Sequence, residues 1–160
     1  MNTTAWLVLI LFFAICLGAG GVVSRLTTDS ARHWYPQLRK PPGTPPSRVF
    51  GPVWTLLYIL MAISAWLVWR EYHGGALPAL LIFFGQLALN VTWPAIFFRA
   101  RMPGLALVEI VLLWLAIALN FLVFGALLPV SALLLLPYWL WVSYAVYLNF
   151  GIWRLNRSRG

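Results

Sequence analysis

Five apolar segments dominate the sequence, and each is long enough to cross the hydrocarbon core of a bilayer, about 30 Å, as an α-helix. They are residues 5–25, 48–70, 79–98, 104–125 and 132–153. The chain is 62% hydrophobic and only 9% charged, whereas in soluble domains about a quarter of the residues are charged. The pattern predicts an all-α integral membrane protein whose five transmembrane helices form one bundle, a single domain over residues 1–160.

Positive charge is concentrated on one side of the expected bundle. Five passes place the connections 26–47 and 99–103 and the C-terminal tail on the same side, which then carries ten of the 11 lysines and arginines; the exception is Arg70. Because cytoplasmic loops carry an excess of such residues, we expect the first connection and the C-terminus to be cytoplasmic and the N-terminus to lie opposite. The net charge of +8 then reflects topology and anionic lipids, so the expected partner is the bilayer and not nucleic acid.

The connection at 26–47 is the longest polar stretch and leads into an aromatic helix. Six prolines lie between Trp34 and Tyr58, and prolines make a linker semi-rigid. In the first segment, Gly18, Gly20 and Gly21 are small residues of the kind that let membrane helices approach closely. They are compatible with packing inside the bundle or with a dimer contact.

Three of the expected helices each carry aromatic and polar side chains on one face. The stripes are Trp54, Tyr58, Met61 and Ala65; Gln86, Asn90, Trp93 and Phe97; and Tyr138, Trp141, Ala145 and Asn149. Polar groups in spanning helices face protein or a cavity, so the stripes indicate either a pocket for a flat, mostly apolar ligand or hydrogen bonds that join helices. The tryptophans Trp54, Trp93 and Trp141 favour the pocket, because all three fall at one level below the first connection.

The sequence carries no recognisable catalytic or metal-binding motif. His33 and His73 fall on opposite sides of the membrane, and Cys16 is a single thiol in an apolar run. Glu109 is an acid inside a span, and we expect it to pair with Arg99, Arg101 or Arg25; the alternative is a proton site.

Four stretches of the chain together resemble one family. They are WYPQLRKP (34–41), PPSRVFGPVWTLLY (45–58), GQLALNVTWPAIFF (85–98) and PYWLWVSYAVYLNFGIWRLN (137–156). In order and spacing they are similar to the TspO/MBR family, the tryptophan-rich sensory proteins of bacteria and the mitochondrial translocator protein. The resemblance implies five helices, frequent homodimers, and binding of porphyrins, sterols and synthetic benzodiazepine-type ligands.

The resemblance also implies a set of ligand-binding residues. The cavity would be walled by residues of three helices and covered by the first connection, with Trp34 in the lid; the stripe on the third helix adds Phe97. The wall residues are Trp54, Tyr58, Asn90, Trp93, Tyr138, Trp141 and Ala145. Trp54 and Trp141 correspond to the two tryptophans suggested to act in porphyrin breakdown.

The sterol-recognition segment of the family is altered in this chain. It has Leu148 and Arg154 in place, but Phe150 replaces the tyrosine, which argues against a sterol partner and fits a bacterial protein.

The predicted function is therefore a membrane receptor for tetrapyrroles, protoporphyrin IX or haem, or similar flat ligands, acting in porphyrin or stress-related signalling. Arg32, Arg39 and Lys40 are candidates to meet the propionates. No cofactor is required. The alternatives are an enzyme that degrades porphyrin with light and oxygen, and a transporter of porphyrins or sterols.

Overall fold

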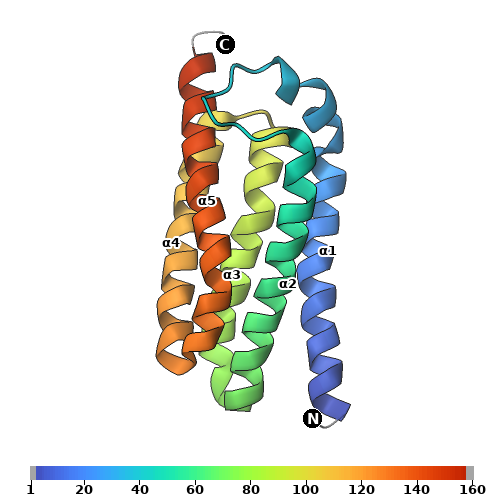
Figure 1. Cartoon of the computed structure of the whole chain (residues 1–160), viewed down its shortest axis with the longest axis vertical. Helices are drawn as coiled ribbons and strands as arrows, with labels where there is room; N and C mark the ends of the chain where they lie inside the picture. Colours follow the sequence, from blue (N-terminus) through green and yellow to red (C-terminus); the bar gives the residue numbers. More distant parts are fainter. Residues whose placement is uncertain (1–2, 158–160) are drawn as a thin grey trace.

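The computed structural model describes residues 3–157, and over that range it consists of helices and short connections. The five α-helices are α1 (Thr3–His33), α2 (Ser47–Tyr72), α3 (Leu77–Pro94), α4 (Pro103–Leu127) and α5 (Pro129–Asn156). Three short turns accompany them: the 3-10 turns η1 (Tyr35–Gln37) and η2 (His73–Ala76) and the π-helical turn η3 (Ala95–Arg99). The helices lie side by side in an elongated bundle with the two termini at opposite ends (Figure 1).

Several of these helices have membrane-spanning length. Within the described residues, four continuous helical segments are long and apolar enough to cross a membrane. Three are the single helices α1, α4 and α5, and the fourth, Ser47–Arg99, contains α2 and α3. Figure 1 shows that α2 and α3 fold back on each other at η2. The predicted all-α architecture with several helices of this length is confirmed.

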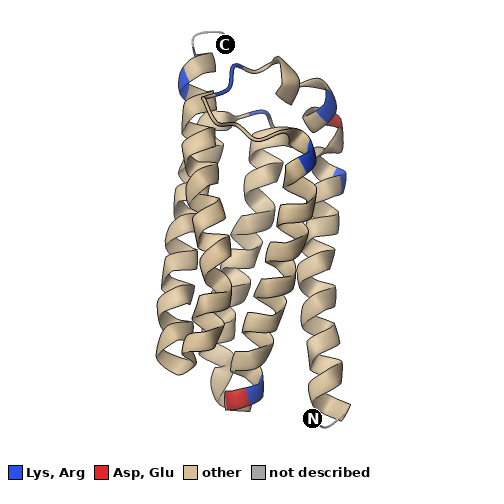
Figure 2. Ribbon diagram, in the orientation of Figure 1, with Lys and Arg blue, Asp and Glu red and all other residues tan. Residues whose placement is uncertain are grey.

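The lysines and arginines lie at the two ends of the bundle. Figure 2 shows lysines and arginines gathered at the end that holds the C-terminus, and a small acidic and basic pair at the turn between α2 and α3. That pair is Arg70 and Glu71, in the last turn of α2. The long apolar middle of the bundle matches the lipid-facing zone that the hydropathy predicts.

The first helix ends later than predicted. The sequence prediction placed a connection over 26–47, but α1 continues to His33. Thr27 and Thr28 donate their hydroxyls to the carbonyls of Val23 and Ser24, at 2.9 and 2.6 Å, so the polar side chains are satisfied by the helix itself. The prediction was wrong because polarity was interpreted as a loop, although no proline occurs before Pro36.

The end of α3 is reshaped by a proline. Pro94 has no N–H to donate, and the chain passes there into η3, where the N–H of Ala100 bonds the carbonyl of Ala95 at 3.0 Å. The wider turn places the rings of Phe97 and Phe98 4.8 Å apart. π-helical turns of this kind are frequent at functional sites.

Residues 39–44, which we call the latch segment, are bound to α5. The side chain of Asn156 accepts from the N–H of Arg39 at 3.1 Å and donates to its carbonyl at 2.9 Å. The hydroxyls of Tyr147 and Tyr144 donate to the carbonyls of Pro42 and Gly43. The latch segment therefore crosses the basic end of the bundle from η1 to α5 before the chain returns to α2 (Figure 1).

Helix α1 is the least buried of the five. Of its 31 residues, only Ala5, Phe12, Cys16 and Ser30 are buried. Its contacts include the ring of Phe12 against Phe83 and Phe84 of α3 and the close approach of Gly20 to Tyr58 of α2. The core of the bundle lies instead among α2 to α5.

Candidate ligand-binding cavity

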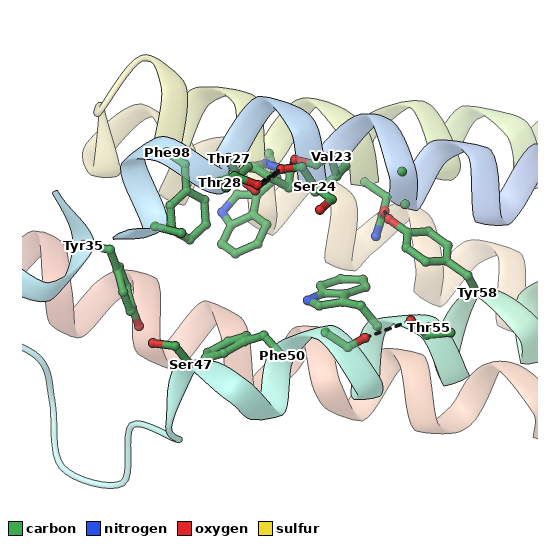
Figure 3. Close-up of a pocket in the computed structure, with 18 of the residues that line it drawn as sticks. Val23, Ser24, Thr27, Thr28, Tyr35, Ser47, Phe50, Thr55, Tyr58 and Phe98 are labelled. Atoms are coloured by element: carbon green, nitrogen blue, oxygen red, sulfur yellow. Dashed lines mark hydrogen bonds between the residues drawn. The ribbon is translucent and has the colours of Figure 1, made fainter. Parts of the chain in front are cut away.

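A cavity of about 580 Å³ lies between α1 and α2, with the end of α3 behind it (Figure 3). Its lining residues come from α1, η1, α2, α3 and η3. They are Leu17, Gly20, Gly21, Val23, Ser24, Thr27, Thr28, Ala31, Arg32, Tyr35, Ser47, Phe50, Gly51, Trp54, Thr55, Tyr58, Asn90, Trp93, Pro94 and Phe98. Figure 3 shows Tyr35, Phe50 and Phe98 at one end of this space and Tyr58 at the other.

A chain of buried hydrogen bonds fixes the inner wall. Tyr58 donates its hydroxyl to Oδ1 of Asn90 at 2.6 Å, and Nδ2 of Asn90 donates to the hydroxyl of Tyr138 at 3.0 Å. Tyr138 in turn donates to Oε1 of Gln86 at 2.9 Å. All four side chains are buried, and a connected polar network inside a protein rigidifies the groups that it joins. Tyr58 and Asn90 therefore meet the cavity in fixed orientations.

The two cavity tryptophans are held in different ways. Trp93 donates its Nε1–H to Oδ1 of Asn149 at 2.9 Å, and Asn149 is itself anchored to the carbonyl of Pro103 at 2.7 Å. Trp54 is held by ring contacts, with its centroid 5.8 Å from Tyr58 and 6.3 Å from Tyr138. Both rings thus present large apolar faces at defined positions.

The wall on α1 was missed by the sequence prediction. Val23, Ser24, Thr27 and Thr28 face the cavity from α1 (Figure 3). Thr27 and Thr28 lie in the stretch that was predicted to be a connection, and Val23 and Ser24 lie at the end of the predicted helix. The signal that could have found them is the spacing of Gly20, Ser24, Thr27 and Ala31, which repeats every three or four residues and continues the stripe of small residues.

The structure brings four of the predicted wall and lid residues to this cavity, together with the propionate candidate Arg32, and places the other predicted residues outside its lining. Trp54, Tyr58, Asn90 and Trp93 line it. Tyr138 is fully buried behind Trp54 and Tyr58.

The remaining predicted residues lie on α5, in η3 and after α1. The ring of Trp141 lies 5.9 Å from Phe50, and Trp34 meets Phe97 edge-on at 5.8 Å. Ala145 is buried. No residue of α5, which the structure describes in full, lines this cavity.

Two further predicted groups have different surroundings from those expected. Glu109 is buried, neither of its carboxylate oxygens has a hydrogen-bond partner, and within residues 3–157 it forms no ion pair with Arg99, Arg101 or Arg25. The prediction of an ion pair is wrong, because Arg99 and Arg101 stay exposed at the end of the bundle.

In the sterol segment, Leu148 is buried while Phe150 and Arg154 are exposed, so the three side chains do not share one face.

The loop end of the cavity carries two titratable groups outside the helices of the membrane zone. Burial, with a smaller contribution from Tyr144, raises the pKa of Tyr35. Lys40 lies over the ring of Tyr35, 4.7 Å from its centroid, and burial lowers the pKa of Lys40. Among residues 3–157, no three His, Cys, Asp or Glu side chains gather to hold a metal ion.

The fold and the cavity define a class of protein, a helical bundle of membrane-spanning length with an aromatic, ligand-sized space between its helices. The chain matches the model of the TspO/MBR family over residues 12–154.

Similar proteins come from animals and bacteria. The chain is 41% identical over 140 residues to "Translocator protein" of Homo sapiens, covering 86% of this chain and 83% of that protein. It is 40% identical over 154 residues to "Tryptophan-rich protein TspO" of Chlorobaculum tepidum, covering 94% and 96%. It is 34% identical over 154 residues to "Tryptophan-rich sensory protein" of Cereibacter sphaeroides, covering 96% and 94%. The chain belongs to the TspO/MBR family and is a multi-pass integral membrane protein.

Proposed function

We propose that the protein is a five-pass membrane receptor that binds a flat and largely apolar ligand, such as protoporphyrin IX or haem, between α1 and α2. The observation that carries the proposal is the cavity of about 580 Å³, a volume within the usual range for small-molecule sites, about 300–1,000 Å³. Its inner wall holds two tryptophans fixed by buried contacts. Relatives named as a sensory protein and a translocator protein support a receptor role.

The lining chemistry favours a planar aromatic ligand with a polar edge. The rings of Trp54, Trp93 and Phe50 offer faces on which a macrocycle can stack. At the basic end, Arg32 lines the cavity and can meet a carboxylate. Lys40 is less available, since its ammonium donates to the carbonyl of Leu38 at 3.2 Å and lies over Tyr35.

The membrane arrangement is part of the same proposal. Each of α1 to α5 crosses the bilayer once, and the basic end seen in Figure 2 faces the cytoplasm. The connection between α1 and α2 then covers the cytoplasmic end of the bundle as a lid. Homodimerisation and sterol binding stay predictions from the family resemblance.

A titration tests the receptor proposal. Purified protein in detergent is titrated with protoporphyrin IX, and binding is followed by the Soret band and by quenching of tryptophan fluorescence. The variant Trp54→Ala is expected to bind about 10-fold more weakly, equivalent to about 1.4 kcal/mol, because it loses a stacking surface.

The matched control is Trp139→Ala. Trp139 packs on Trp114 and Phe121 at the α4–α5 side and is absent from the lining. We expect the Trp139→Ala variant to bind protoporphyrin IX with the same affinity as the unmodified protein. Equal affinities for all three proteins, or no saturable binding at all, would contradict the proposed site.

A further inference from the structure

The exposed residues of the cavity lining form a row along the seam between α1 and α2. Its exposed members are Leu17, Gly21, Ser24, Thr28 and Arg32 on α1 and Ser47, Gly51 and Thr55 on α2. The members contributed by α3 are all buried. The cavity is therefore a slot with a closed back on α3 and an open side between two helices.

The open side extends into the membrane zone. From Arg32 near the basic end to Leu17, the lining covers about 22 Å of α1 at about 1.5 Å per residue. In Figure 3, Ser47 and Tyr35 lie toward one end of this slot, and Thr55 and Tyr58 lie toward the other. With α1 and α2 across the bilayer, as the proposed function has them, an opening of this length along helices of membrane-spanning hydropathy would face lipid acyl chains over much of its extent.

The two threonine hydroxyls along the opening are bonded to their own helices. Thr28 donates its hydroxyl to the carbonyl of Ser24 at 2.6 Å, and Thr55 donates to the carbonyl of Gly51 at 2.9 Å. In hydrocarbon, hydroxyls bonded to their own helix avoid the cost of an unpaired polar group. At Gly21 and Gly51, an added Cβ would meet no atom within 4 Å, so the opening is flanked by free space.

The basic end of the bundle, by contrast, is crossed by bonded backbone. The latch segment is attached to α5 through Asn156, Tyr147 and Tyr144. Pro41 packs against α5 so closely that a Cβ on Gly151 would come within 2.6 Å of its ring. Passage through this end would require these contacts to break.

We propose that the ligand enters and leaves the cavity sideways, from the hydrocarbon core of the bilayer, through the seam bounded by Gly21 and Ser24 on α1 and Gly51 and Thr55 on α2. This inference rests on the proposed receptor function. It deepens that function by stating the source of the ligand: the cavity takes molecules that have first dissolved in the membrane.

The test uses stopped-flow kinetics on protein in phosphatidylcholine vesicles, mixed with vesicles that carry protoporphyrin IX. The variants Gly21→Leu and Gly51→Leu add bulk at the seam, at positions where an added Cβ meets no atom within 4 Å. The control is Gly18→Leu, on the same helix, where an added Cβ also meets nothing within 4 Å and which is absent from the lining. Tryptophan quenching gives the association rate, and the final signal gives the equilibrium affinity.

We expect both seam variants to slow association and dissociation about 10-fold, since a narrowed passage affects both rates alike. The control is expected to keep the rates of the unmodified protein. Unchanged rates in both seam variants with intact affinity would overturn the lateral route alone, whereas absence of saturable binding in the unmodified protein would overturn the receptor function with it.

A second variant excludes the end route. Asn156→Ala removes both hydrogen bonds to Arg39 and loosens the latch segment at a distance from the seam. If the ligand enters sideways, the Asn156→Ala variant binds it with the same association rate as the unmodified protein. A marked acceleration in Asn156→Ala, together with normal rates in the seam variants, would assign entry to the lid.

Discussion

Arg32 gives the cavity a charged edge. It is exposed, lines the cavity, and has no ion-pair partner within the described part of the chain. Its position one turn beyond Thr28 places a guanidinium where the helix leaves the apolar zone, and long cationic side chains extend toward such interfaces. A ligand with an apolar body and an acidic edge would match the apolar lining inside the slot with its body and Arg32 at the basic end with its acidic edge.

A matched pair of ligands tests this role of Arg32. The variant Arg32→Gln is expected to bind protoporphyrin IX about 3-fold more weakly, in keeping with an exposed ion pair worth about 0.2–1 kcal/mol. Its affinity for protoporphyrin dimethyl ester should match that of the unmodified protein, because the ester carries no carboxylate. The control is Arg48→Gln, an exposed arginine at the start of α2 that does not line the cavity. Equal losses for acid and ester in Arg32→Gln would disprove the ion pair.

Among the elements, α1 and α2 approach each other closely at a glycine. A Cβ on Gly20 would lie 2.8 Å from Cε2 of Tyr58, and Tyr58 is tied by its hydroxyl to Asn90 of α3. This contact therefore links the packing of α1 on α2 to the position of Tyr58 in the inner wall.

Substitution at this contact should affect both stability and the site. Gly20→Ala is expected to displace the ring of Tyr58 and to lower the free energy of unfolding by about 1–3 kcal/mol, the usual cost of an extra methyl group in a tight contact. The measurement is thermal unfolding in detergent, followed by tryptophan fluorescence. Gly18→Ala adds the same methyl group to the same helix in free space and should leave the midpoint equal or higher. A midpoint for Gly20→Ala as high as that of Gly18→Ala would refute the contact.

The elements also show what the sequence could and could not predict. The interior position of Gln86, Asn90 and Trp93 follows from the rule that polar groups in a span avoid lipid, and all three are buried. The wall on α1 could not be found in this way. Its threonines bond to their own helix, but in the sequence their polarity is typical of a loop.

Helical periodicity has a further limit at α5. It predicts that Tyr138 and Ala145 face the protein, and both are buried. Periodicity does not tell which internal space a buried side chain adjoins, since this depends on the tilt and rotation of neighbouring helices. The seam between α1 and α2 was likewise invisible in the sequence, because an opening is a relation between two helices.

On the scale of the whole molecule, the asymmetry of charge orients the bundle. The end with the latch segment carries most of the basic residues, and Arg70 stands at the other end next to Glu71 (Figure 2). A positive-inside bias of this strength predicts a single orientation, with the lid in the cytoplasm.

Cysteine labelling tests the orientation and the number of passes. In a Cys16→Ala background, single cysteines are introduced by Thr3→Cys, Glu71→Cys and Arg157→Cys, at positions that are exposed. An impermeant maleimide should label the first two only in right-side-out vesicles and the third only in inside-out vesicles. Labelling of the Thr3 and Arg157 positions from the same side would contradict an odd number of passes.

The latch segment has a mechanical consequence. By bonding residue 39 to residue 156, it closes α2 to α5 into a ring. Helix α1 lies outside that ring, connected to it in sequence through residues 34–38 and packed on α2 and α3. We expect a change in the width of the cavity to come mainly from a tilt of α1, of whose 31 residues only four are buried. Ligands of different thickness can be accommodated by the movement of one helix, while the wall formed by α2 and α3 keeps its shape. We accordingly expect the ring of α2 to α5 to set which ligands the cavity selects, and α1 to set how much variation in ligand thickness the cavity tolerates.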